Sequence, residues 1–92
     1  MFRVIDTILF QSGWTHRYPE FAERGDGVMV ILDPKQIREP PKIQGRVVMV
    51  HKCDGSVVRL IASSSKVHHS VVGVFFAGAS SDDIPRGADL EW

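Results

Sequence analysis

The sequence predicts an all-β protein, specifically a small six-stranded antiparallel β-barrel, from two observations. First, six short runs rich in Val, Ile and Phe lie between clusters of Gly, Pro and Asp, and β-branched and aromatic residues in runs of this length are typical of strands. Second, a chain of 92 residues can organise one hydrophobic core but not two. Residues 1–92 are therefore expected to form a single domain.

The first two predicted strands are residues 2–10 and 28–32. Both are mainly apolar, and they lie on either side of a long irregular segment that contains Gly and Pro. Because Gly and Pro interrupt regular structure, we expect an extended loop at about residues 11–26.

The third and fourth predicted strands, residues 46–52 and 56–62, lie on either side of Asp54-Gly55. A type I′ turn requires positive φ at both central residues, and Asp-Gly tolerates this conformation. The dipeptide therefore predicts a tight hairpin between these two strands.

The last two predicted strands are residues 71–77 and a short run at 88–92. Between them, the adjacent acids Asp82 and Asp83 precede Ile84-Pro85. Paired carboxylates can perform acid and base chemistry, but this context favours a turn that presents Ile84 to the core.

Three of these runs are apolar at nearly every position: residues 28–32, 47–50 and 71–76. An antiparallel sheet with one face in water normally alternates apolar and polar residues. Each Val, Phe or Met left in water forgoes roughly 1.5–3 kcal/mol of burial, so an exposed apolar face favours association. We expect the outer face of these strands to pack on the long loop, on a second copy of the chain or on another protein.

The last third of the chain carries the most specific pattern. The pattern consists of Gly73, Val74, Phe75, Phe76, Gly78, Asp83, Ile84, Arg86, Gly87 and Leu90. Together these residues resemble the closing strand pair of domain 2, the β-barrel second domain, of elongation factor Tu and related translation GTPases. The resemblance implies a stand-alone barrel similar to elongation factor Tu domain 2.

Earlier segments resemble the same family in the order of their elements, which extends the resemblance to nearly the whole chain. Residues 2–6 are similar to the family's opening strand. Residues 45–48 stand in place of its Gly-Asp-x-Val, with Arg46 where the family has the acidic residue. In translation factors this barrel helps to hold the aminoacylated end of transfer RNA and touches ribosomal RNA. The phosphate-binding Gly-x-x-x-x-Gly-Lys-Ser/Thr pattern is absent from the sequence, so we expect no nucleotide hydrolysis.

The net charge indicates which partners the protein is expected to attract, and the cysteine count indicates its cellular compartment. Eleven basic and eleven acidic residues give a formal net charge of zero, so long-range attraction to nucleic acid or anionic lipid is weak unless the charges are segregated. Partial segregation is visible in a basic group of Lys35, Arg38, Lys42, Arg46 and Lys52 and an acidic group of Asp82, Asp83, Asp89 and Glu91. The single Cys53 cannot form an internal disulfide, and no run has the length of a signal peptide or a membrane span. We expect a cytoplasmic location and no membrane partner.

Two groups of residues suggest chemistry, and both have simpler interpretations. His51 and Cys53 lie two apart on a predicted strand, on the same side, but a cysteine nucleophile also needs an orienting group and an oxyanion hole. His68 and His69 suggest zinc, but the paired ligand spacing of structural zinc sites is absent. We therefore predict a protein that is not an enzyme and has no cofactor and no metal site.

The long loop contains the candidate partner-binding residues Trp14, His16, Arg17, Tyr18 and Phe21. Aromatic side chains on a loop that a rigid scaffold positions are where binding usually takes place. The alternative is that the aromatic residues fold back as a lid over an open end of the barrel.

These observations predict a small non-enzymatic interaction module. It would bind a protein partner, or associate with itself, through its apolar outer strands and the aromatic loop. The alternative is an RNA-binding accessory protein related to translation, which would use Arg17, Tyr18 and the basic residues between Lys35 and Lys52.

Overall fold

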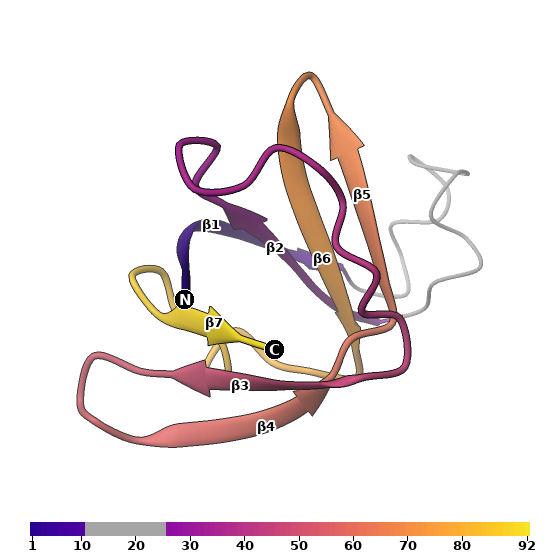
Figure 1. Ribbon diagram of the computed structural model, residues 1–92. Helices are drawn as coiled ribbons and strands as arrows, with labels where there is room; N and C mark the ends of the chain where they lie inside the picture. Colours follow the sequence, from indigo (N-terminus) through magenta and orange to yellow (C-terminus); the bar gives the residue numbers. More distant parts are fainter. Residues whose placement is uncertain (11–25) are drawn as a thin grey trace.

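The chain folds as an all-β structure (Figure 1). The computed structural model describes residues 1–10 and 26–92. The strands are β1 (Phe2–Phe10), β2 (Gly27–Leu32), β3 (Val47–His51), β4 (Val57–Ile61), β5 (Ser64–His68), β6 (Val71–Ala77) and β7 (Asp89–Glu91). They form one seven-stranded sheet in the order β4-β3-β7-β1-β2-β6-β5, in which the neighbouring strands are antiparallel.

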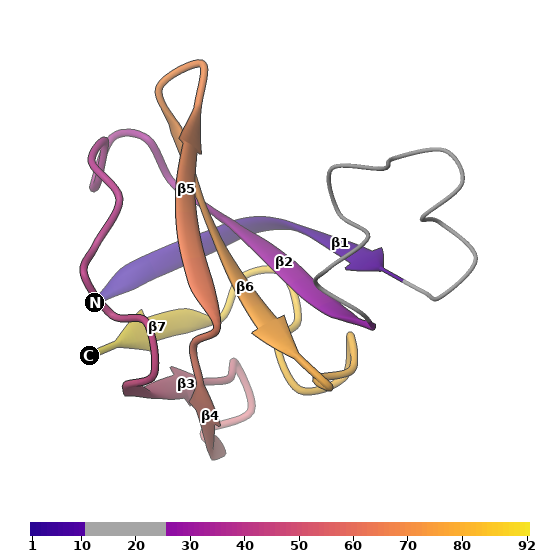
Figure 2. The ribbon, with the colours of Figure 1, turned by 90° about the vertical axis from the view of Figure 1, so that its right-hand side faces the viewer.

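Strand β1 joins two halves of this sheet. Phe2 and Arg3 pair with β7, whereas Val4 and residues 6–10 pair with β2, with a register shift between Val4 and Asp6. We call β2, β6 and β5 the β2–β6 region, and β7, β3 and β4 the β3–β4 region. Figures 1 and 2 show the hairpin of β5 and β6 rising from the fold, while β3 and β4 lie along its lower border.

Each of the six predicted runs contains a strand whose bounds differ from the expected ones by no more than one residue. The predicted number of strands was wrong because the structure adds β5, which pairs with β6. The turn between these two strands consists of His69 and Ser70, whose φ values are 52° and 65°. The hydrogen-bonded order is open, with β4 at one edge and β5 at the other.

The core lies between the two regions and is built from the inward-facing side chains of both. Its members are no more than 2% exposed: Val4, Val28, Val30, Leu32, Ile43, Val48, Val50, Ala62, Val72, Val74, Phe76, Ile84, Ala88 and Leu90. In the part of the chain that the structure describes, no polar or charged side chain is buried. The core is thus held by apolar packing alone. Side chains alternate between the two faces of a strand, so the core residues define an inner face of the sheet and the residues between them an outer face.

The hairpin between β3 and β4 is confirmed, but its turn is not the type I′ turn that Asp54-Gly55 predicts. Only Gly55 has positive φ, at 91°, and its N–H donates to the carbonyl of Lys52 at 3.1 Å. The Asp54 carboxylate accepts hydrogen bonds from the N–H and the hydroxyl of Ser56 at 2.8 and 2.6 Å. These bonds lower the pKa of Asp54. The connection is therefore a three-residue loop with glycine in the left-handed position, and an Asx turn fixes its end.

The turn predicted around Asp83 is also confirmed. Its carboxylate accepts hydrogen bonds from the N–H and the hydroxyl of Ser80 at 3.0 and 3.2 Å. The next residue, Ile84, is fully buried in the core. Further on, Gly87 has a φ of 87°, and its N–H donates to the carbonyl of Val4 at 2.9 Å, which attaches the turn to β1.

Candidate interaction surface

The five residues predicted to bind a partner lie outside the residues that the structure describes. They are Trp14, His16, Arg17, Tyr18 and Phe21. The candidate surface is therefore sought among the strands. It consists of those residues of the apolar runs whose outer side chains are exposed to water.

In the β2–β6 region, residues 27–30 of β2 and 72–76 of β6 are buried on both faces of the sheet. On the outer face Met29 of β2 lies opposite Phe75 of β6, and the two side chains are 8% and 1% exposed. Ile31 packs against this pair. A Cβ atom placed on Gly27 would lie 2.7 Å from Cζ of Phe75, so only glycine fits there. The outer faces of these two strands are therefore buried at this pair.

In the β3–β4 region the outer face is open. It is formed by Val47, Met49, His51, Val57, Arg59 and Ile61, which we call the β3–β4 outer face. Val47 and Ile61 lie opposite each other and are 53% and 61% exposed, and Val57, which lies opposite His51, is 45% exposed. For β3, the expectation that a second copy of the chain or another protein covers the outer face stays a prediction. Here the strand alternates, with Val48 and Val50 in the core.

The backbone of β4 is open along the side away from β3. The N–H of Lys52 donates to the carbonyl of Ser56 at 2.9 Å, and the N–H of Ala62 donates to that of Arg46 at 3.0 Å. In an antiparallel pair, hydrogen-bonded and non-bonded positions alternate. The even-numbered residues of β4 therefore bond to β3, and the odd-numbered residues direct their N–H and C=O groups away from the sheet.

Three residues of β4 occupy these outward positions: Val57, Arg59 and Ile61. Among the strands that the structure describes, none pairs with this edge. The side chains of the same three residues lie on the β3–β4 outer face. The exposed apolar surface and the open edge are thus continuous.

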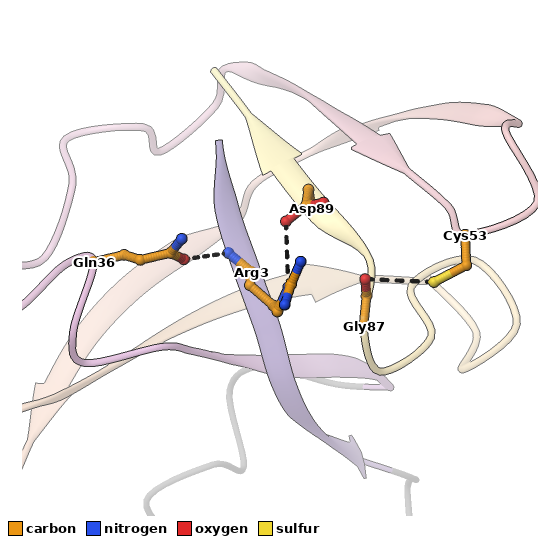
Figure 3. A network of polar contacts seen from close by, with 5 residues as sticks. All are labelled: Arg3, Gln36, Cys53, Gly87 and Asp89. Carbon is orange, nitrogen blue, oxygen red and sulfur yellow. Dashed lines mark hydrogen bonds and ion pairs between the residues drawn. The ribbon is translucent and has the colours of Figure 1, made fainter.

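The opposite border of this face is ionic and internally paired. His51 Nε2 donates to Glu91 Oε1 at 2.9 Å, and Arg3 Nε lies 3.8 Å from Asp89 Oδ1. Figure 3 shows Arg3 held on its other side, where its backbone N–H donates to Gln36 Oε1 at 2.7 Å. These contacts fix β7 between β1 and β3, and they leave the acidic groups of β7 with cationic or donor partners.

Arg59 differs from these charged residues. It lies opposite Met49, and no ion pair joins its guanidinium to any other residue within the described ranges. The exposed side of the β3–β4 region therefore presents one unpaired cation between apolar neighbours.

The residues that suggested a cysteine nucleophile have separate partners. Cys53 lies in the hairpin loop rather than on the strand, and its Sγ–H donates to the carbonyl of Gly87 at 3.5 Å (Figure 3). His51 bonds to Glu91 instead. The expected arrangement of His51 and Cys53 on one strand was therefore wrong, because β3 ends at His51.

The histidine pair lies far from this group along the sheet. His68 ends β5 and His69 begins the turn, and their ring centroids are 4.1 Å apart in an edge-to-face contact. His69 lies beyond the end of the strand, in the turn between β5 and β6. Within residues 1–10 and 26–92, no group of three His, Cys, Asp or Glu side chains could hold a metal ion.

The basic residues that suggested RNA binding lie mostly in the connection between β2 and β3. Lys35, Arg38, Lys42 and Arg46 are exposed there, and Arg38 Nε donates to the carbonyl of Pro34 at 3.2 Å. Lys52 is half-buried beside the hairpin loop. The exposed basic residues are the candidate surface for RNA, and the β3–β4 outer face is the candidate surface for a protein partner.

Comparisons with protein-family models, with curated proteins and with solved structures found no match to this chain. For the described part of the chain, no helix has the length and apolar character needed to cross a membrane.

Proposed function

We propose that this protein is a small non-enzymatic interaction module that binds a protein partner through the β3–β4 outer face. One observation carries the proposal. Val47, Val57 and Ile61 are 45–61% exposed on two paired strands, whereas Met29 and Phe75 on the outer face of β2 and β6 are buried. Contiguous apolar surface of this kind, with a polar border, is characteristic of binding sites.

The expected gain on binding is moderate. A Val or Ile side chain gains roughly 1.5–3 kcal/mol on full burial, so three half-exposed side chains would gain about 3 kcal/mol together. This corresponds to a change of about a hundredfold in the dissociation constant. Replacing these exposed apolar side chains with polar ones should therefore weaken a complex measurably without unfolding the protein.

The absence of a catalytic role is part of the proposal. It is supported by the separate partners of His51 and Cys53, namely Glu91 and the carbonyl of Gly87, and by a core in which the buried side chains of the described residues are apolar. A nucleophile needs a base within hydrogen-bonding distance.

We also propose that the fold is an open relative of elongation factor Tu domain 2, in which the strands of that barrel stand alone. The proposal is supported by the turn at Asp83, by the buried Ile84 and by the left-handed glycines Gly45 and Gly87 before β3 and β7. An experimental structure would test it by superposition on that domain.

The function is tested by affinity capture of the tagged protein from its native extract, with and without ribonuclease. The test variant is Val47→Thr with Ile61→Thr, and the control is Val67→Thr on β5, where a valine is 41% exposed outside the proposed surface. We expect a companion that survives ribonuclease, is lost with the double variant and is kept by the control.

Two results would contradict the proposal. Companions that disappear on ribonuclease treatment, especially ribosomal proteins, would support the RNA-binding alternative, whose affinity should also fall steeply with salt. A companion that is retained equally by both variants would place binding elsewhere on the molecule.

A further inference from the structure

The open edge of β4 has the features of a site for an added strand. Val57, Arg59 and Ile61 direct their backbone N–H and C=O groups outward, as the alternation of the β3–β4 ladder requires. Extended peptides bind such edges through main-chain hydrogen bonds, and the alternate side chains of the peptide supply specificity. We propose that β4 receives an extended acidic peptide of a partner protein as an antiparallel strand. This inference rests on the proposed function and names the chemistry of the partner.

The register of the ladder specifies the peptide's pattern. A peptide residue opposite Arg59 forms a hydrogen-bonded pair with it and places its side chain on the same, outer face. The peptide residues two positions before and two positions after it lie opposite Val57 and Ile61, also on that face. The residues in between point to the inner face. The edge therefore selects an apolar residue, an acidic residue and a second apolar residue at alternate positions.

Charge complementarity specifies the acidic position. The guanidinium of Arg59 has no ion pair within the described ranges, and its neighbours on the outer face are Met49 across the ladder and Val57 and Ile61 along β4. A carboxylate on the peptide would accept hydrogen bonds from the guanidinium in a bidentate geometry. Because the pair is exposed, it contributes little to affinity but sets the register and excludes cationic peptides.

The same residue argues against a second copy as the occupant. Two copies of β4 paired antiparallel about Arg59 would place Val57 opposite Ile61 of the other copy, which is favourable. They would also place the two Arg59 side chains directly opposite each other. Like charges at opposed positions destabilise a strand pair, so an acidic strand from another protein fits this edge better.

The probe is a blocked peptide, Ser-Val-Thr-Glu-Thr-Val-Ser, titrated into the isotope-labelled full chain and followed by the amide resonances. A matched peptide carries Lys in place of Glu. We expect saturable shifts at the amides of Val57, Arg59 and Ile61, small shifts in β5, and binding of the Lys peptide about five- to tenfold weaker.

A charge-reversed variant makes the assignment specific. Arg59→Glu should invert the preference, so that the Lys peptide binds more tightly than the Glu peptide. Arg46→Glu is the control, because Arg46 is an exposed arginine that precedes β3, and it should keep the original order. An inverted preference in Arg59→Glu alone would establish that this guanidinium reads the peptide.

Three results would overturn the inference. Equal binding of both peptides by the wild-type protein, or no shift at the β4 amides at millimolar peptide, would show that the edge does not select acidic strands. Shifts at the same amides on concentrating the protein alone would make a second copy the occupant. If any of these three results appears while partner capture still depends on Val47 and Ile61, the face binds its partner in another way and the proposed function stands. If capture is also independent of these residues, both proposals fail.

Discussion

The β2–β6 region and the β3–β4 region are built from similar residues but differ in exposure. In the first, Met29 and Phe75 on the outer face are 8% and 1% exposed, whereas in the second Val47 and Ile61 are 53% and 61% exposed. Both regions contribute buried side chains to the central core through their inner faces. If the proposed function is correct, this difference teaches that one end of the sheet serves the stability of the fold and the other end serves partner binding. Substitutions on the outer faces should therefore have opposite consequences in the two regions.

The largest contrast is expected between Phe75→Ala and Ile61→Ala. Truncating a buried phenylalanine typically costs about 3–5 kcal/mol, because contacts are lost and a cavity remains. Truncating a mostly exposed isoleucine should change the free energy of unfolding by about 0.5 kcal/mol or less. Urea denaturation of both variants measures the two values, and comparable losses would break the distinction between the regions.

A second contrast lies within strand β3. Val50→Thr introduces a hydroxyl group into the core, where Val50 is fully buried, and should destabilise the protein by about 1–3 kcal/mol. Val47→Thr places the same group in water and should be nearly neutral. Thermal unfolding of this isosteric pair would contradict the assignment of faces if the two melting temperatures fell by the same amount.

A third test concerns how tightly β2 and β6 approach. An added methyl at Gly27 would meet the Phe75 ring and the backbone carbonyl of Phe76, so Gly27→Ala should cost about 1–3 kcal/mol through overpacking. An added methyl at Gly73 would lie 2.9 Å from Sδ of Met29, the flexible end of a side chain that can move aside. Gly73→Ala should therefore be the milder substitution in the same denaturation assay, and the reverse order would contradict this packing.

The strands and one turn could be predicted from sequence because their signals are local. Apolar runs bounded by Gly, Pro and Asp located six of the seven strands, and Asp83 beside Ile84 indicated the turn correctly. Strand β5 was missed because Ser64–His68 contains only one strongly apolar residue, Val67. Its hairpin turn was also hidden, since His69 and Ser70 adopt positive φ without glycine.

The proposed binding surface could not be predicted in the same way. Val47 and Val50 have the same side chain, and only the pairing of β3 with β4 and β7 decides which one lies in the core. The openness of β4 depends on the order of strands in the sheet, which no local pattern encodes. Arg59 was therefore missed. The single charged residue Arg59 in an otherwise apolar run was the available signal, because a charged side chain marks the face of a strand that is in water.

The smallest effect is expected at the hairpin that supports this open region. The two hydrogen bonds from Ser56 lower the pKa of Asp54 in the folded protein below its ordinary value of 3.8. Their contribution to stability is thus present above the unfolded pKa and is lost as the pH falls through the folded pKa. Carboxyl resonances followed in an acid titration should give a lower pKa for Asp54 in the wild-type protein than in Ser56→Ala. Identical values would show that Ser56 does not hold the loop.

The most direct test of the central claim is amide hydrogen exchange along β4 in the dilute protein. If the face and the edge of the β3–β4 region are open, the amides of Val58 and Leu60 should be protected by β3, and those of Val57, Arg59 and Ile61 should exchange rapidly. Along β6, which is paired on both sides, odd and even amides should be protected alike. Uniform protection along β4 would contradict the account, because it would mean that another segment already occupies the edge.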